Sequence, residues 1–179
     1  MDFPGKPYLK APATWEKVFK EKLAKYKGKK IGVSWKGGIK STGKNYREVK
    51  LSDWGDIFNQ DATFISLQYN DDSHHDIEEA GLKDKILHWQ DVMDDYDQTA
   101  GLVANLDLVI SVPQSAVHLA GAVGIPTWQL CPRRGMWQQG VYGHNAPWYK
   151  CVKNFWQDGF GDWDGVIKNV ERELKAWIK

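Results

Sequence analysis

The sequence has few cysteines, almost no net charge and no long apolar run. Its 179 residues include two cysteines, Cys131 and Cys151, and 24 lysines and arginines against 23 aspartates and glutamates. Two distant cysteines fit neither a disulfide framework nor close metal-ligand spacing, so we expect free thiols and a reducing, cytoplasmic location. A chain with so little basic excess is not expected to bind nucleic acid.

Membrane spanning and export are equally unsupported by the sequence. The longest uncharged run, residues 115–131, is interrupted by His118, Gly121, Gly124 and Pro126. The first residues contain no apolar core of the kind that a secretory signal needs. We therefore expect no membrane span and no signal peptide.

The composition is that of one folded domain. Hydrophobic residues make up 42% and charged residues 26%, close to the average of globular proteins, and no segment is biased enough to predict disorder. A chain of this length buries most of its surface without disulfides or metals. Ten tryptophans are an unusual number. They can supply core volume, stacking platforms or interface anchors, and composition does not choose between these roles.

Apolar periodicity predicts strands that alternate with helices. The expected strands are 30–35, 63–67, 86–89, 107–111, 126–130 and 148–155. The expected helices are 12–26, 52–58, a helix capped by Asp97 that runs to residue 106, 115–123 and 161–178. Parallel neighbours need crossover connections, so this rhythm predicts an α/β, Rossmann-like, three-layer domain with a mostly parallel sheet of about six strands. Residues 1–28 are expected to be a linker and a helix packed on the domain 29–179.

One strand-to-helix turn has the features of a phosphate site. In residues 111–118 a strand end, a proline turn and a helix start follow one another, so backbone N–H groups after Pro113 should point out of the sheet. Ser115 adds a hydroxyl, and His118 follows about one turn later. The alternative is an ordinary helix cap with a buried histidine, and local chemistry leaves both interpretations open.

Residues 97–126, DQTAGLVANLDLVISVPQSAVHLAGAVGIP, resemble the nucleotide-binding segment of ADP-heptose transferases, especially relatives attached to tetratricopeptide repeats. The resemblance continues in residues 31–38, 64–68, 147–149 and 161–164. That family implies a two-domain GT-B fold, in which the C-terminal half holds the nucleotide sugar and the N-terminal half presents the acceptor. This chain resembles the C-terminal half alone.

The resemblance implies donor-binding residues in two loops. Ser34, Lys36, Gly37 and Gly38 match the loop after the first strand, and Pro113, Gln114, Ser115 and His118 match the second phosphate-facing turn. Lys44 and Arg47 are looser matches. Gln68, Trp89 and Arg133 complete the expected set: Gln68 ends a matching strand, Trp89 can stack or line the cleft, and Arg133 can reach phosphate. The common family pattern has Asp-Thr-Gly where this chain has Pro-Gln-Ser at residues 113–115. Because of this difference, the resemblance does not identify the sugar of the donor.

Three other motifs do not predict the NTPase or metal site that each superficially resembles. The loop 36–44 resembles a P-loop but lacks its spacing and its Gly-Lys-Ser/Thr ending, so it predicts no NTPase. We interpret it as an exposed, flexible loop whose cations, Lys36 included, can neutralise phosphate charge. The pair Asp95 and Asp97 fits helix capping better than metal ligation. Residues 74–76, His-His-Asp, lack further zinc ligands and are expected in a solvated loop.

Two functions follow from these expectations. The first is a glycosyltransferase-like domain that binds a nucleotide-diphosphate sugar as donor substrate and stabilises the leaving nucleotide electrostatically, without metal or cofactor. In the family the general base belongs to the N-terminal half, so the resemblance names no catalytic residue here. The expected partner is an acceptor-binding domain or a second copy of the chain. The second function is a non-catalytic module that binds a nucleotide or nucleotide sugar.

Overall fold

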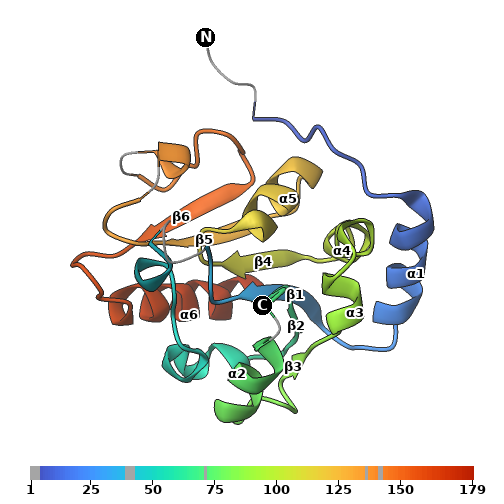
Figure 1. Ribbon diagram of the computed structural model, residues 1–179, viewed down its shortest axis with the longest axis horizontal. Helices are drawn as coiled ribbons and strands as arrows, with labels where there is room; N and C mark the ends of the chain where they lie inside the picture. Colours follow the sequence, from blue (N-terminus) through green and yellow to red (C-terminus); the bar gives the residue numbers. More distant parts are fainter. Residues whose placement is uncertain (1–4, 39–42, 71, 136, 141–142) are drawn as a thin grey trace.

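A computed structural model describes residues 5–38, 43–70, 72–135, 137–140 and 143–179, and its core is one parallel sheet (Figure 1). The strands run in the order β3-β2-β1-β4-β5-β6, and every neighbouring pair is parallel. They are β1 (Lys29–Ser34), β2 (Ala62–Ser66), β3 (Ile86–Leu87), β4 (Leu108–Ser111), β5 (Thr127–Cys131) and β6 (Val152–Trp156). The predicted α/β, Rossmann-like fold is confirmed.

Helices cover both faces of this sheet (Figure 1). The helices are α1 (Ala13–Leu23), α2 (Ser73–Glu79), α3 (Gln90–Met93), α4 (Tyr96–Val103), α5 (Ser115–Val123) and α6 (Asp164–Ile178). Short 3₁₀ turns are η2 (Lys44–Tyr46), η3 (Leu51–Asp53), η4 (Gly55–Asn59) and η5 (Trp137–Gln139). One core cluster packs α6, η4 and α2 on the sheet, and another packs α1, α3, α4 and α5 on the opposite face.

The strands are buried on both faces, which explains their unbroken apolar runs. Along β4, Leu108 and Ile110 belong to the core under α6, whereas Val109 belongs to the core under α4 and α5. Successive side chains of a strand point to opposite faces, so a strand between two helical layers needs apolar residues at every position.

The N-terminal segment lies against the helices of one face. The backbone N–H groups of Tyr8 and Leu9 both donate to the carbonyl of Ala122 in α5, and the segment then enters α1 (Figure 1). Helix α1 packs on α4 with Phe19 buried. A Cβ at Gly101 of α4 would lie 2.5 Å from the Cβ of Trp15, so glycine permits this close approach.

Several local predictions are wrong. Residues 52–58 form parts of η3 and η4 rather than one helix, and β6 begins at Val152 rather than at residue 148. Residues 73–79 form α2 rather than a solvated loop, because Ile77 is buried in the core and tertiary contacts stabilise a helix of polar sequence. Helix α4 is capped by Asp95, whose Oδ1 accepts from the N–H groups of Asp97 and Gln98 at 2.9 and 3.2 Å, so Asp97 is not the cap. Strand β3 ends at Leu87, and Trp89 is the extended residue that precedes α3.

Both edges of the sheet carry little open strand. Edge strand β3 has two residues. Beside the other edge strand, β6, the Ala146 N–H donates to the Val152 carbonyl at 3.2 Å and the Asn154 N–H donates to the His144 carbonyl at 2.7 Å. An antiparallel bridge joins Asn145 to Lys153, so residues 144–146 cover the outer side of β6.

Two further sequence expectations concern cysteines and membranes. Cys131 and Cys151 are free thiols, as predicted, and Cys131 is buried. Among the helices formed by the described residues, none has the length and apolarity needed to cross a bilayer.

Candidate functional site

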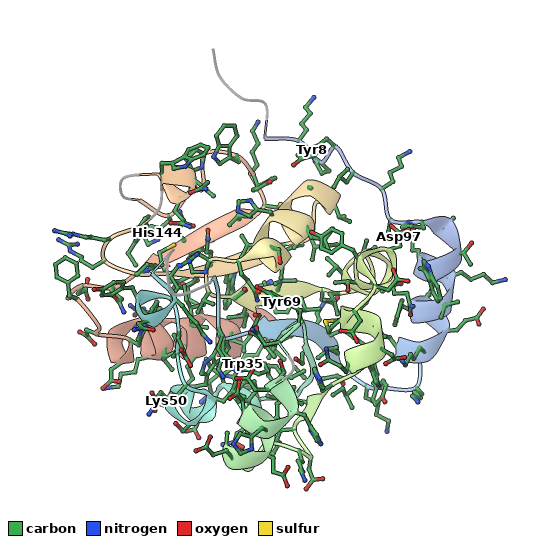
Figure 2. The ribbon with its side chains drawn as sticks, viewed as in Figure 1. Tyr8, Trp35, Lys50, Tyr69, Asp97 and His144 are labelled. Carbon is green, nitrogen blue, oxygen red and sulfur yellow. The ribbon has the colours of Figure 1, made fainter. Side chains whose placement is uncertain are left out.

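The two predicted loops meet at the carboxyl ends of β1 and β4, beside a cavity of about 240 Å³ that we call the central cavity. Six predicted residues line it: Gly38, Arg47, Pro113, Gln114, Ser115 and His118. Tyr69, Gln138 and Gln139 also line it and were not predicted. Tyr69 follows β2 and lies near the centre of the view in Figure 2. Tyr69 follows the carboxyl end of a parallel strand, where ligands of such sheets bind, so this position could have predicted it as a site residue.

Gly37 allows the two loops to touch. A Cβ at this position would lie 2.4 Å from the carbonyl oxygen of Pro113, a distance that real Cβ atoms do not reach. The next residue, Gly38, has a φ of 79°, in the left-handed region that favours glycine. The glycine pair therefore lets the β1 loop pack against the turn that begins α5.

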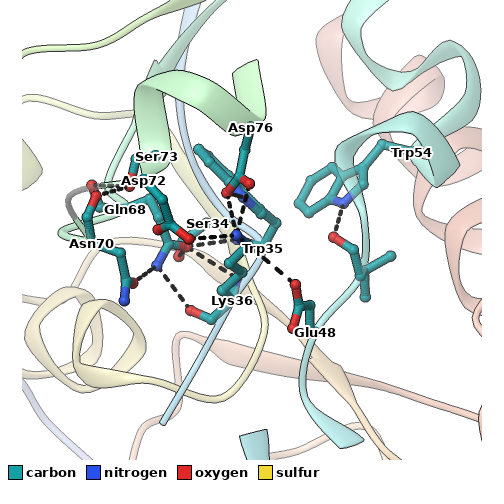
Figure 3. Close-up of polar contacts among 11 residues, drawn as sticks. Ser34, Trp35, Lys36, Glu48, Trp54, Gln68, Asn70, Asp72, Ser73 and Asp76 are labelled. Atoms are coloured by element: carbon teal, nitrogen blue, oxygen red, sulfur yellow. Dashed lines mark hydrogen bonds and ion pairs between the residues drawn. The ribbon is translucent and has the colours of Figure 1, made fainter. Parts of the chain in front are cut away.

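Gln68 fixes the shape of the β1 loop (Figure 3). Its Oε1 accepts from the Ser34 hydroxyl at 2.8 Å and from the backbone N–H groups of Trp35 and Lys36 at 3.1 and 3.0 Å. Its Nε2 donates to the Lys36 carbonyl at 3.1 Å and to Asn70 Oδ1 at 2.5 Å. Gln68 is fully buried, and these bonds occupy both ends of its amide. Ser34 and Gln68 thus position the loop from beneath the central cavity.

Lys36 is buried rather than exposed, which corrects the expectation of a flexible loop cation. Its Nζ lies 2.7 Å from Asp76 Oδ1, 3.2 Å from Asp72 Oδ2 and 3.9 Å from Glu48 Oε1 (Figure 3). Burial lowers the pKa of Lys36, but hydrogen bonds and attraction from Asp76 and Asp72 outweigh it, and the net pKa is raised. The Trp35 indole also donates to Asp76, at 2.8 Å. The Lys36 charge therefore joins the β1 loop to α2.

Gln114 places a buried amide without hydrogen-bond partners among the described residues beside the central cavity. It precedes α5 with extended backbone and is 8% exposed. Neither its Nε2 nor its Oε1 has a hydrogen-bond partner among the described residues. A buried amide without partners costs free energy, and native proteins contain few of them. Helix α5 also has no side-chain cap, and its first residue, Ser115, lines the same cavity as Gln114.

Arg47 supplies positive charge to the central cavity. Its side chain is buried, and its Nη1 donates to the Pro113 carbonyl at 3.4 Å. Burial lowers the pKa of Arg47 below its usual value, but a guanidinium stays protonated at neutral pH. A fixed, planar cation beside a helix N-terminus favours binding of an oxyanion.

His118 lies one turn into α5, beside Tyr149. Its Nδ1 lies 3.3 Å from the Tyr149 hydroxyl, and the two rings meet edge to face with centroids 5.8 Å apart. Burial lowers the pKa of His118 below 6.5, so the imidazole is neutral at pH 7. A neutral imidazole can donate one hydrogen bond to an anion and accept another from a hydroxyl.

The structure does not bring every predicted residue to the central cavity. Trp89 packs against Phe19, and the Lys22 ammonium lies 3.9 Å from the centre of its indole. Lys44 begins η2 and is outside the set of described residues that line the central cavity. Arg133 lines a neighbouring cavity that also includes Arg47. Residues 39–42 of the predicted Gly-Lys loop lie outside the described residues.

The acidic and histidine motifs do not form a metal centre in the described part of the chain. No group of three His, Cys, Asp or Glu side chains is placed there to hold a metal ion. Asp95 caps α4, and Asp76 pairs with Lys36.

Comparison with solved structures matches the fold of the chain to the folds of glycosyltransferases. No model of a protein family matches the chain. Protein FlbA of Caulobacter vibrioides is 30% identical over 154 residues, which cover 83% of this chain and 25% of that protein. The structure of Escherichia coli ADP-heptose LPS heptosyltransferase II aligns with a TM-score of 0.66 and 13% identity, over 96% of this chain and 53% of that one.

A second solved structure gives the same result. Glycosyl transferase family 9 protein from Veillonella parvula aligns with a TM-score of 0.63 and 12% identity, over 86% of this chain and 43% of that one. The chain thus spans about half the length of these two structures and a quarter of FlbA. It has a glycosyltransferase-like fold, which confirms the fold predicted as half of a GT-B enzyme.

Proposed function

We propose that the chain binds a nucleoside diphosphate sugar with the diphosphate in the central cavity and forms the donor side of a glycosyltransferase. The buried, unpartnered amide of Gln114 at the start of α5 carries this proposal. The two aligned structures are of a heptosyltransferase and a family 9 glycosyl transferase, which supports transfer of a sugar as the chemistry.

The groups around the cavity suit a diphosphate. Its oxygens would accept hydrogen bonds from the first N–H groups of α5, the Ser115 hydroxyl and the Gln114 Nε2, while Arg47 would balance its charge. Negative charge grows on the diphosphate as the bond to the sugar breaks. Donors that are already in place would stabilise this charge without a reorganisation cost.

The residues beneath the cavity would act indirectly. Gln68 and Ser34 hold the β1 loop, and the Lys36 ion pairs hold that loop against α2. In this arrangement Lys36 is a positioning residue, and Arg47, the one lysine or arginine among the described residues that line the cavity, would balance the ligand's charge. The role first expected of Lys36 passes to Arg47.

Acceptor binding belongs to a second region in this proposal. The chain aligns with about half of each of the two transferase structures, so a separate acceptor-binding domain or a second copy of the chain would complete the enzyme. A module that binds nucleotide sugar without transferring it is the second candidate, and it uses the same cavity.

Binding is tested by titrating the protein with ADP, UDP, GDP and CDP and their sugars while backbone amide resonances are recorded. We expect saturable shifts in residues 34–38 and 113–118. Gln114→Glu keeps the shape of the side chain but replaces its donor with a negative charge, and a hydrogen bond to a charged group contributes about 1.5–3 kcal/mol. Affinity should therefore fall at least about tenfold.

The matched control is Asn169→Asp, which makes the same amide-to-carboxylate change on α6, where Arg172 already contacts Asn169 at 2.8 Å. This variant should bind like the wild type. Absence of saturable shifts with the whole panel, in protein shown to be folded, would disprove the donor-site proposal.

A further inference from the structure

A second cavity of about 490 Å³ continues the same sheet edge beyond the central cavity. It lies where the chain leaves β5 and β6, and Arg47 lines both cavities. We call it the arginine cavity, because Arg133 and Arg134 line it together with Arg47. Its volume lies within the range of cavities that hold small molecules.

The arginine cavity contains a buried hydrogen-bond donor that has no acceptor in the part of the chain that the structure describes. Gln157 follows β6 and is 2% exposed. Its Oε1 accepts from the N–H groups of Arg133 and Gly161 at 3.0 and 3.3 Å, and these two donors fix the orientation of the amide. Its Nε2 has no partner among the described residues. Because Oε1 accepts both of these hydrogen bonds, the unpartnered atom of the amide is the donor Nε2, which can bind an acceptor atom of a ligand.

The walls of the arginine cavity are cationic and aromatic. The side chains of Phe160 and Trp163 line it, and the Arg134 guanidinium lies 5.5 Å from the centre of the Phe160 ring. No aspartate or glutamate is among the described residues that line it. Arginines with a fixed amide donor recognise carboxylate or phosphate, whereas the rings offer flat apolar surface to the body of the same ligand.

We propose that the arginine cavity is a second anion site, which binds a carboxylate or phosphate carried on a small ring-shaped molecule. Gln157 Nε2 donates to this oxyanion and the arginines neutralise it. The site is separate from the α5 terminus proposed for the diphosphate, although Arg47 adjoins both. It therefore does not depend on the identity of the donor nucleotide, and it can be tested with no nucleotide present.

The first experiment uses three related probes at constant ionic strength: glucuronate, glucose 6-phosphate and glucose. We expect saturable shifts of the Gln157 side-chain amide and the Gly161 backbone amide with at least one of the two anions and not with glucose. Equal shifts with all three probes would overturn anion recognition. No saturable shift with either anion, in folded protein, would overturn the site.

The second experiment changes the donor without changing the fold. Gln157→Glu keeps an oxygen to accept from Arg133 and Gly161 but replaces the Nε2 donor, so binding of the anion should weaken at least about tenfold. Arg134→Gln, at an exposed side chain, should also weaken binding, and Asn169→Asp on α6 should not. Binding that both cavity variants leave unchanged would contradict the proposal.

The source of the anion is decided by a third comparison. If the donor sugar carries it, Gln157→Glu should weaken binding of UDP-glucuronate much more than binding of UDP-glucose. If a separate molecule carries it, glucuronate or glucose 6-phosphate should bind protein already saturated with UDP. Either result supports the second site. If the diphosphate proposal is wrong but the second site exists, the protein should not bind UDP and should still bind glucuronate or glucose 6-phosphate.

Discussion

Lys36 shows how the role of one residue depends on contacts far away in sequence. Its carboxylate partners Asp72 and Asp76 are in or next to α2, a helix that the sequence did not predict. Without that helix, a lysine after a strand and before two glycines is typical of an exposed loop that contacts phosphate. The identity and position of Lys36 were predictable, but its burial depended on the folding of a polar segment some forty residues later.

We predict that Lys36→Met destabilises the fold by about 2–3 kcal/mol. Removal of one partner from a fully buried ion pair costs about 3–5 kcal/mol, and the half-exposed Asp72 makes this case milder. Lys29→Met is the matched control, because Lys29 forms an exposed ion pair with Asp107 and such pairs contribute at most about 1 kcal/mol. Urea denaturation of the three proteins gives the comparison. Unchanged stability with lost nucleotide binding would instead make Lys36 a ligand contact.

His118 provides a prediction about pH. Burial holds its pKa below 6.5 in the free protein, and a neighbouring diphosphate would raise that pKa by favouring the charged imidazole. Binding near pH 6 should therefore take up protons, and affinity should increase as the pH falls from 7 to 6. Calorimetry in two buffers of different ionisation enthalpy measures this uptake, which His118→Gln should remove. Proton release on binding would place the ligand away from His118.

The free energy of unfolding should depend on the same imidazole with a defined sign. Because the pKa is lower in the folded than in the unfolded state, the unfolded state binds more protons in the intervening range. The contribution of His118 to stability is therefore present above about pH 6.5. It is lost as the pH falls toward the folded pKa.

At the scale of elements, the site depends on contact between the β1 loop and the turn before α5. Gly37→Ala would place a Cβ 2.4 Å from the Pro113 carbonyl, so the two loops must separate. Overpacking of this kind costs about 1–3 kcal/mol. We expect that loss in chemical denaturation and a matching loss of diphosphate affinity.

Gly159→Ala is the control for this change. Gly159 has no positive φ, and its added Cβ would meet nothing nearer than 3.8 Å. Its stability and nucleotide binding should both match the wild type. If Gly37→Ala also behaved like the wild type, the close contact between the loops would not determine the shape of the site.

Elements with strong apolar patterns were predicted best. The sequence of β4 is apolar because the strand lies between two helical layers, and that of α5 is apolar because the helix packs into two core clusters. Their predicted bounds lie within one residue of the structure. By contrast, α2 contacts the core mainly through Ile77, so its remaining residues carry no helical period. Gln138 and Gln139 of the central cavity follow β5 in a short 3₁₀ turn, whose position no local pattern specifies.

At the scale of the whole molecule, we predict that the isolated chain binds a donor but transfers sugar poorly. Without an aligned acceptor it forfeits the advantage of proximity, which reaches about 7–11 kcal/mol in well-oriented reactions. Mass spectrometry of monomeric protein with nucleotide sugars and a panel of saccharide and peptide acceptors should detect mainly slow donor hydrolysis. Rapid enzyme-dependent glycosylation would show that one domain contains both sites.

The short and covered edges of the sheet limit how this domain can assemble with others. Exposed edge strands are templates for strand addition, and this leads to domain swapping and fibrils. Here β3 offers two residues and residues 144–146 occupy the outer side of β6. Association through added strands is therefore disfavoured at both ends, so a partner would have to dock on helices or loops. Docking of that kind can be reversed without breaking any hydrogen bond of the sheet.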